Sequence, residues 1–141
     1  MKVHNPLFLH FTFIIINMNL IGNLIWLICG GLLSALGYAV AGLVFCATII
    51  GIPFGWQCFK IAAFVLWPFG KTVVNEDSSS GCLSLLFNII WICTGGIYTA
   101  LVHIVFAFLL FITIIGIPFA RKHLELAGLA LAPFGKRIVY E

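Results

Sequence analysis

Charged residues are scarce in this sequence. Asp, Glu, Lys and Arg together make up 8% of its 141 residues, against about 25% in a soluble domain. Hydrophobic residues make up 63%, so the chain has too few polar side chains to cover a globule in water. This scarcity excludes an ordinary soluble domain and predicts an integral membrane protein.

Acidic residues are especially few, with four in the whole chain. The sequence contains no serine–histidine–acid set and no phosphate-binding glycine loop, and its one adjacent carboxylate pair, Glu76 and Asp77, lies in a polar linker, so it predicts no catalytic residues and no enzyme. The five cysteines include no C-x-x-C pair, and their irregular spacing predicts neither a metal site nor a disulfide framework. We therefore expect no metal, no cofactor and no cofactor-binding residues.

The net charge of +3 is small, and the basic residues lie next to apolar runs. That arrangement is typical of anchors at a membrane surface and differs from a nucleic-acid-binding patch. The expected partner is therefore the lipid bilayer and not a nucleic acid. The sequence identifies no protein partner.

What the chain does contain is a long internal repeat. The string TIIGIPF occurs at residues 48–54 and again, unchanged, at residues 113–119. The same shift of 65 residues matches further residues on both sides without a gap. The matched pairs are Asn23 and Asn88, Trp26 and Trp91, Gly30-Gly31 and Gly95-Gly96, and the Pro-Phe-Gly-Lys strings that begin at Pro68 and Pro133. The chain is therefore two copies of one unit, joined by a polar linker at residues 75–82.

Each copy begins with an apolar run, at residues 20–52 and 83–117. One crossing of the hydrocarbon core takes about 20 residues, so each run is long for one crossing and short for two. Each is either one tilted or kinked helix, or a tight hairpin. The positive-inside rule favours a hairpin turning near residues 95–103, because both basic clusters then face the cytoplasm and the copies lie in parallel. Single crossings would make the copies inverted.

A Gly-Ile-Pro sequence ends each run. Gly51 and Gly116 are able to take the left-handed conformation that closes a helix. Pro53 and Pro118 suit the first turn of a new helix, because a proline in that position needs no N–H. The motif therefore predicts that one helix stops and another begins.

The segments that follow, 54–67 and 119–132, carry charges on one side and aliphatic residues on another, which is typical of helices in the membrane interface. Trp26, Trp67 and Trp91 fit the aromatic belts of that interface. The predicted fold is an all-helical integral membrane protein of two tandem repeats. Each repeat is an apolar transmembrane helical segment or hairpin followed by an amphipathic interfacial helix.

Six strings follow one another in the first copy: Asn-x-x-Trp, Gly-Gly, Ala-Leu-Gly-Tyr, Thr-Ile-Ile-Gly-Ile-Pro-Phe-Gly, Gln-Cys-Phe-Lys and Leu-Trp-Pro-Phe-Gly-Lys. In this order they resemble the YccF family of small bacterial inner membrane proteins. The resemblance implies a multi-pass location in the inner (cytoplasmic) membrane and two YccF-type repeats, at residues 18–74 and 83–141. It implies no reaction, substrate or catalytic residue.

Proteins of this kind typically begin close to the Asn-x-x-Trp element. Residues 18–23 resemble such a start. We therefore expect residues 1–17 to be an N-terminal extension and the native chain to begin at Met18. The alternative is a signal peptide, although no small-residue cleavage site follows the apolar residues 7–16.

Residues around the Gly-Ile-Pro break are candidates for a pathway or hinge. Thr48 and Thr113 would line a polar path with unwound carbonyls, as in transporters with broken helices, or else bond to their own helix. His103 is ionisable within an apolar run, which marks a functional candidate; alternatively it caps an outer turn or bonds to Tyr38, its counterpart in the first copy. The candidate residues are Thr48, Gly51, Pro53, His103, Thr113, Gly116 and Pro118.

Polar contacts between the copies are also expected. Asn23 and Asn88 either line the path or join the copies through hydrogen bonds in lipid. Lys60 and Glu125 occupy matching positions with opposite charge and would pair across the copies.

Two such units contain too little protein to enclose a pathway, so a conducting form is expected to be a homo-oligomer. The sequence leaves two main functions open. One is a small oligomeric channel or permeation protein with the broken helices near its path. The other is a membrane scaffold that docks partners on its basic cytoplasmic face. An intramembrane enzyme is the weakest alternative.

Overall fold

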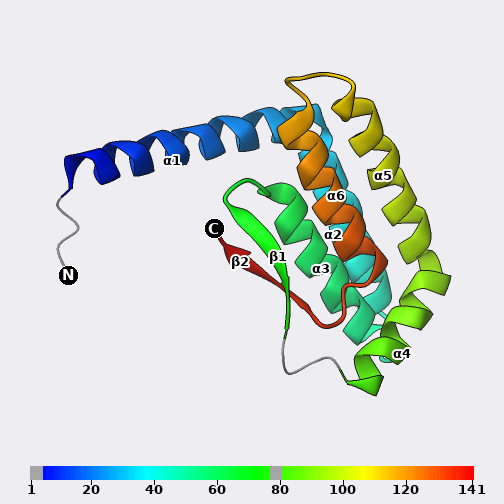
Figure 1. Ribbon diagram of the computed structural model, residues 1–141. Coiled ribbons are helices and arrows are strands. Elements are labelled where there is room, and N and C mark those ends of the chain that lie inside the picture. Colours follow the sequence, from blue (N-terminus) through cyan, green and yellow to red (C-terminus); the bar gives the residue numbers. More distant parts are fainter. Residues whose placement is uncertain (1–4, 77–80) are drawn as a thin grey trace.

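The computed structural model describes residues 5–76 and 81–141, and these residues are mostly helical (Figure 1). The first repeat and the segment before it contain α1 (Pro6–Trp26), the π-helical turn η1 (Leu27–Gly31), α2 (Leu32–Cys46), α3 (Ile52–Leu66) and strand β1 (Lys71–Asn75). The second contains α4 (Cys82–Trp91), η2 (Ile92–Gly96), α5 (Ile97–Phe111), α6 (Ile117–Leu131) and strand β2 (Lys136–Tyr140). The order of elements is the same in both, which confirms the two tandem repeats.

Each apolar run forms one bent helix. The helix continues from α1 through η1 into α2, and from α4 through η2 into α5. The bends lie at Gly30, with φ 125°, and at Gly95, with φ 142°, conformations that favour glycine. A Cβ on Gly31 would lie 2.2 Å from the ring of Trp26, so the second glycine of the pair makes room for that indole. The hairpin expected near residues 95–103 is therefore wrong, and the kinked-helix alternative is correct.

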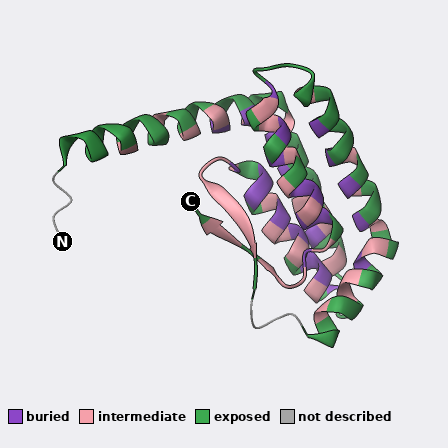
Figure 2. Cartoon of the chain, viewed as in Figure 1, coloured by how far each residue is buried: buried purple, intermediate pink, exposed green. Residues whose placement is uncertain are grey.

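Two helices within the described residues are long and apolar enough to cross a membrane, Pro6–Cys46 and Cys82–Phe111. Exposed residues cover α1 and the outer side of α5, and many of them are large and apolar (Figure 2). Such a surface suits contact with lipid tails. Of the expected extension at residues 1–17, residues 1–4 lie outside the described part, and α1 runs without a break through the remainder.

The hairpins of the fold lie instead at the TIIGIPF turns, where α2 packs antiparallel on α3 and α5 on α6 (Figure 1). The Thr48 hydroxyl donates to the carbonyl of Phe45 at 2.9 Å and accepts from the N–H of Gly51 at 3.1 Å. Gly51 has a right-handed φ of −79°, so the expected left-handed conformation is wrong. Glycine is needed because a Cβ would lie 2.2 Å from the Phe45 carbonyl oxygen.

The second turn has the same construction. Thr113 donates to the carbonyl of Leu110 at 3.0 Å and accepts from the N–H of Gly116 at 3.1 Å. Gly116 is also right-handed, with φ −76°. Pro53 and Pro118 stand in the first turns of α3 and α6, as their sequence position predicts. The two threonines therefore make hydrogen bonds within their own turns, in agreement with the prediction that they bond to their own helix.

The repeats meet in a two-stranded antiparallel sheet that was not expected from the sequence. Lys71 pairs with Tyr140, and Val73 with Ile138. Val73 and Ile138 are equivalent under the shift of 65 residues. A local two-fold axis between equivalent residues therefore relates the repeats at this point.

The predicted linker at residues 75–82 is joined to structure at both ends. The N–H of Glu76 donates to the carbonyl of Gly135 at 2.8 Å, and Cys82 begins α4. Residues 77–80 of the linker lie outside the described residues.

The buried core lies between α3 and α6, which carry most of the buried hydrophobic side chains (Figure 2). Among the apolar side chains of these two helices with no exposed surface are Ile61, Phe64 and Val65 of α3 and Ala120, Leu126, Leu129 and Ala130 of α6.

Candidate functional site

Four aromatic rings join the repeats as two equivalent pairs. Trp26 stacks on Phe119, with ring centroids 6.4 Å apart and planes at 4°. Trp91 stacks on Phe54 at 6.4 Å and 2°. The last residue of each TIIGIPF string therefore packs against the other repeat. Both tryptophans are buried, and the indole N–H of Trp26 donates to the Val65 carbonyl at 2.7 Å, so their predicted place in an interface belt is wrong.

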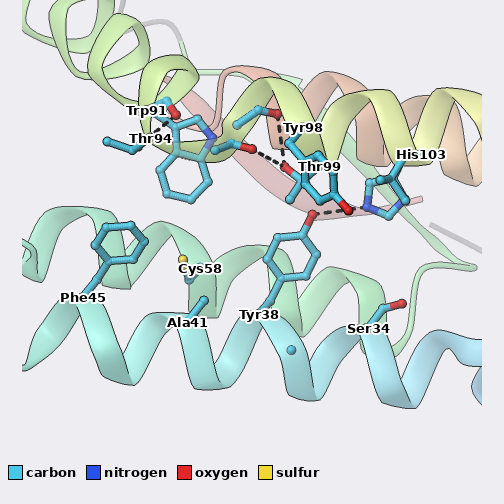
Figure 3. A pocket seen from close by; sticks show the side chains of 14 residues that line it. Ser34, Tyr38, Ala41, Phe45, Cys58, Trp91, Thr94, Tyr98, Thr99 and His103 are labelled. Carbon is cyan, nitrogen blue, oxygen red and sulfur yellow. Dashed lines mark hydrogen bonds between the residues drawn. The ribbon is translucent and has the colours of Figure 1, made fainter.

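Three polar side chains form a hydrogen-bonded chain between the repeats, which we call the polar chain. The Tyr38 hydroxyl of α2 lies 3.2 Å from Nε2 of His103 on α5. Nδ1 of His103 lies 3.1 Å from Nδ1 of His123 on α6. Figure 3 shows Tyr38 and His103 pointing toward each other from facing helices. His103 thus contacts Tyr38, its counterpart in the first repeat, as the sequence analysis predicted in one of its alternatives.

Two cavities flank the polar chain. The Tyr38 cavity, shown in Figure 3, has a volume of about 410 Å³, and the His123 cavity has a volume of about 580 Å³. Ser34, Val102 and His103 line both, so His103 lies between them. The Tyr38 cavity is further lined by the polar residues Cys58, Thr94, Tyr98 and Thr99, and the His123 cavity by Trp26, Cys29 and Thr113.

His123 lies among aromatic rings. The centroid of its ring is 4.8 Å from that of Trp26, and the ring stacks on Phe106 at 5.4 Å. Burial lowers the pKa of His123 to about 4, so the ring is neutral at pH 7. A neutral imidazole has one donor and one acceptor nitrogen. When both rings are neutral, the tautomer of His123 therefore determines that of His103 through the Nδ1–Nδ1 contact.

The structure brings together predicted pathway residues of the second repeat. His103, Thr113 and Gly116 all line the His123 cavity. Their first-repeat equivalents Thr48 and Gly51 are absent from both cavity linings, as far as the described residues form them. The two turns therefore have the same backbone construction but different surroundings.

Asn23 and Asn88 make their hydrogen bonds within their own repeats. The Asn23 amide donates to the carbonyl of Phe69 and accepts from its N–H, both at 2.9 Å. The amide of Asn88 makes the same pair of bonds with Phe134 at 3.0 Å. The expected inter-repeat role is therefore wrong, because each amide matches the backbone donor and acceptor of the Pro-Phe-Gly turn beside it.

The predicted ion pair between Lys60 and Glu125 is also wrong. Lys60 donates to the carbonyl of Pro133 and, at 2.8 Å, to that of Lys136. Glu125 instead pairs with Lys122 of its own helix at 3.2 Å. Lys60 does join the repeats, but through backbone carbonyls.

Lys122 makes the reciprocal contact. Its amino group donates to the carbonyl of Lys71 at 2.8 Å. Lys71 and Lys136 are equivalent residues at the starts of β1 and β2. Each repeat therefore contributes one lysine whose amino group donates to the first residue of the other repeat's strand. The amino group of Lys60 is largely buried, and this burial lowers its pKa to about 8.

Sequence reasoning missed the roles of Lys122 and His123. A signal for them exists, since RKH at residues 121–123 stands where the first repeat has WQC at 56–58. The two repeats keep the glycines and prolines of the TIIGIPF and Pro-Phe-Gly-Lys strings on either side of this position but differ at these three residues. The difference marks the place where the second repeat supplies polar contacts.

The chain matches a family model described as an inner membrane component domain, at residues 21–71 and again at 86–136. It is similar to the inner membrane protein YccF of Escherichia coli (strain K12), with 31% identity over 130 residues, covering 86% of this chain and 88% of the relative. The same values hold for the inner membrane protein YccF of Shigella flexneri. No solved structure matches the chain. The two segments matched by the family model together make up more than half of the chain, which therefore belongs to the YccF family of inner membrane proteins.

Proposed function

We propose that this protein is a small permeation protein of the inner membrane, in which a small polar species passes between the two repeats. One arrangement carries the proposal: the polar chain of Tyr38, His103 and His123 lies between two cavities. Polar groups at membrane depth are costly, and ionisable ones there usually belong to a substrate or ion path.

The polar chain also holds the repeats together, but that role alone does not account for the cavities. Both cavities are partly open at the protein surface, so they give access from outside to each side of His103. Volumes of about 410 and 580 Å³ on the two sides of His103 each hold several waters, taking about 30 Å³ for one. This space supports a path.

The proposed membrane orientation rests on the β1–β2 sheet. Its strands carry Lys71, Lys136 and Arg137, which the positive-inside rule assigns to the cytoplasmic surface. The local two-fold axis of an antiparallel strand pair is perpendicular to the sheet. If that axis follows the membrane normal, both repeats have the same orientation. This differs from the inverted arrangement expected for single crossings, because α3 and α6 return the chain beside α2 and α5.

The proposed working unit is a homo-oligomer. In its described part a single chain provides two bent helices of spanning length, which leave the two cavities beside the polar chain partly open. Large apolar residues on the outer surface of α5, such as Phe108, are available for contact with lipid or with a second copy. Chemical crosslinking of the purified protein, with and without detergent dilution, measures the size of that oligomer.

The test is a flux measurement on the full chain in liposomes. Protons, potassium and chloride are followed separately with ion-sensitive dyes, for the wild-type protein, His103→Leu and the control His10→Leu. His10 lies on the exposed part of α1. We expect flux of one species above that of empty liposomes, lost in His103→Leu and retained in His10→Leu. Flux equal to that of empty liposomes for all three species contradicts the proposal.

A scaffold is the second candidate, and the sheet favours it. Within the described residues β1 and β2 pair only with each other, so each strand keeps one open edge, and Arg137 on β2 is exposed. An extended acidic segment of a partner would add to such an edge. The test measures binding of a labelled acidic peptide to the reconstituted protein and to its Arg137→Glu variant. If no flux is found, binding that is weaker in the variant would support the scaffold role.

A further inference from the structure

We propose that the polar chain is a proton relay, so that the species passing between the two cavities is the proton. This inference rests on the proposed permeation function and specifies its substrate. It begins from the continuity of the chain: three side chains from three different helices are linked by contacts of 3.2 and 3.1 Å, with one end in each cavity.

The contacts are too close for any larger species. Tyr38, His103 and His123 lie at hydrogen-bonding distance from one another, so an ion or a water molecule could pass only after these contacts separated. A proton moves along such a chain while the heavy atoms stay in place. The geometry therefore favours the proton over potassium or chloride.

The surroundings also lack compensating charge. Among the described residues that line the two cavities, there is no Asp, Glu, Lys or Arg. The titratable groups that face the relay are its own members, Cys58 of α3 beside Tyr38, Tyr98 in the same cavity lining, and Cys29 in the lining of the His123 cavity. A resting cation would therefore be poorly stabilised, whereas a neutral relay holds no resident charge.

The hydrogen bonds are consistent with two opposite orientations. In the first, the Tyr38 hydroxyl donates to Nε2 of His103, Nδ1–H of His103 donates to Nδ1 of His123, and His123 carries its proton on Nε2. In the second, every donor and acceptor is exchanged, and the Tyr38 hydroxyl proton points into the Tyr38 cavity, which Thr99 also lines. Neutral imidazole rings and a phenol permit both.

Moving one proton converts the first orientation into the second. A proton arrives at the Tyr38 oxygen from its cavity, and the existing hydroxyl proton moves to Nε2 of His103. The Nδ1 proton of His103 moves to Nδ1 of His123, which releases its Nε2 proton to the other cavity. One proton enters and one leaves, and every group ends neutral. The chain resets when the two contacts open transiently, each histidine gives its ring proton to cavity water, and each takes a proton from cavity water on its other nitrogen.

The test compares Tyr38→Phe with Tyr98→Phe in full-length protein reconstituted into liposomes. Both substitutions remove one hydroxyl from the lining of the same cavity, but Tyr98 is exposed and outside the relay. An internal pH dye records proton influx under a potassium diffusion potential. We expect Tyr38→Phe to lower proton flux by at least about tenfold, in keeping with the loss of a group that transfers the proton. We expect Tyr98→Phe to leave it unchanged.

Nitrogen NMR of histidine-labelled protein gives a readout independent of flux. In the wild type we expect coupling between the Nδ1 atoms of His103 and His123 across their hydrogen bond, and a change of the His103 tautomer distribution in Tyr38→Phe. Equal proton flux in Tyr38→Phe and wild type, or no coupling between the rings, overturns the relay. Flux of potassium or chloride without protons overturns the relay while leaving the permeation function standing, and absence of all flux overturns both.

Discussion

Trp26 of the first repeat lies flat against Phe119 of the second, with ring centroids 6.4 Å apart and planes at 4°. Phe119 also meets Phe69 edge-on at 5.2 Å, so its ring sits between two aromatic residues of the first repeat. The equivalent contacts surround Phe54. Each copy of the string TIIGIPF therefore supplies the ring against which the tryptophan of the other copy packs, and this exchange explains why the chain carries the string twice.

Replacement of Phe119 by alanine is expected to lower the free energy of unfolding by about 2–4 kcal/mol, since it removes buried ring surface and the stacking on Trp26. Equilibrium unfolding in mixed detergent micelles measures this loss. Phe108→Ala is the matched control, because Phe108 is exposed on α5. Its effect is expected to stay within about 0.5 kcal/mol. Equal losses in the two variants would contradict the interlocked arrangement.

The bend at Gly30 gives a second prediction. Gly30→Ala forces an alanine into a φ of 125°, which costs about 1–3 kcal/mol although the site has open space for a Cβ. Gly37→Ala adds the same methyl group in the regular part of α2, also into open space. That change is expected to be neutral or to stabilise by about 0.5–1 kcal/mol. Equilibrium unfolding of both variants measures the change in the free energy of unfolding. Similar changes in Gly30→Ala and Gly37→Ala would show that the bend is not needed.

Lys60 makes stability depend on pH. Burial lowers its pKa in the folded protein from 10.5 to about 8, so between these values the unfolded chain binds more protons than the folded one. Stability therefore rises with pH across that window. The Lys60→Met variant lacks this titration. The difference in unfolding free energy between wild type and Lys60→Met should grow from pH 8 to pH 10.5, and a constant difference would contradict the buried position of the amine.

The repeat and its turns could be predicted because they depend on short motifs of consecutive residues. A proline after glycine marks a helix start wherever it occurs, and Pro53 and Pro118 stand in first helical turns as expected. The bend at Gly95 was harder to predict. A glycine pair within an apolar run suits a hairpin or a kink equally, and the charge rule that favoured the hairpin contains no information on backbone φ.

Long-range partners could not be read from the sequence. The strand β1 has no partner within its own repeat, and β2 lies far along the chain, so neither segment was identified as a strand. Tyr38 and His103 could be paired because they are equivalent positions. His123 was missed because its place in the polar chain depends on how α6 packs on α5, which no local pattern contains.

The pairing of Val73 with Ile138 has the symmetry of an isologous interface between two identical subunits. A chain carrying a single copy of the unit could form that interface with itself, as a homodimer. Fusion into one gene frees the halves to differ: position 38 is tyrosine where its equivalent is His103, and position 58 is cysteine where its equivalent is His123. A homodimer of identical subunits would place the same residues on both sides of its two-fold axis. In the fused chain the residues on the two sides differ, so the two sides have different chemistry.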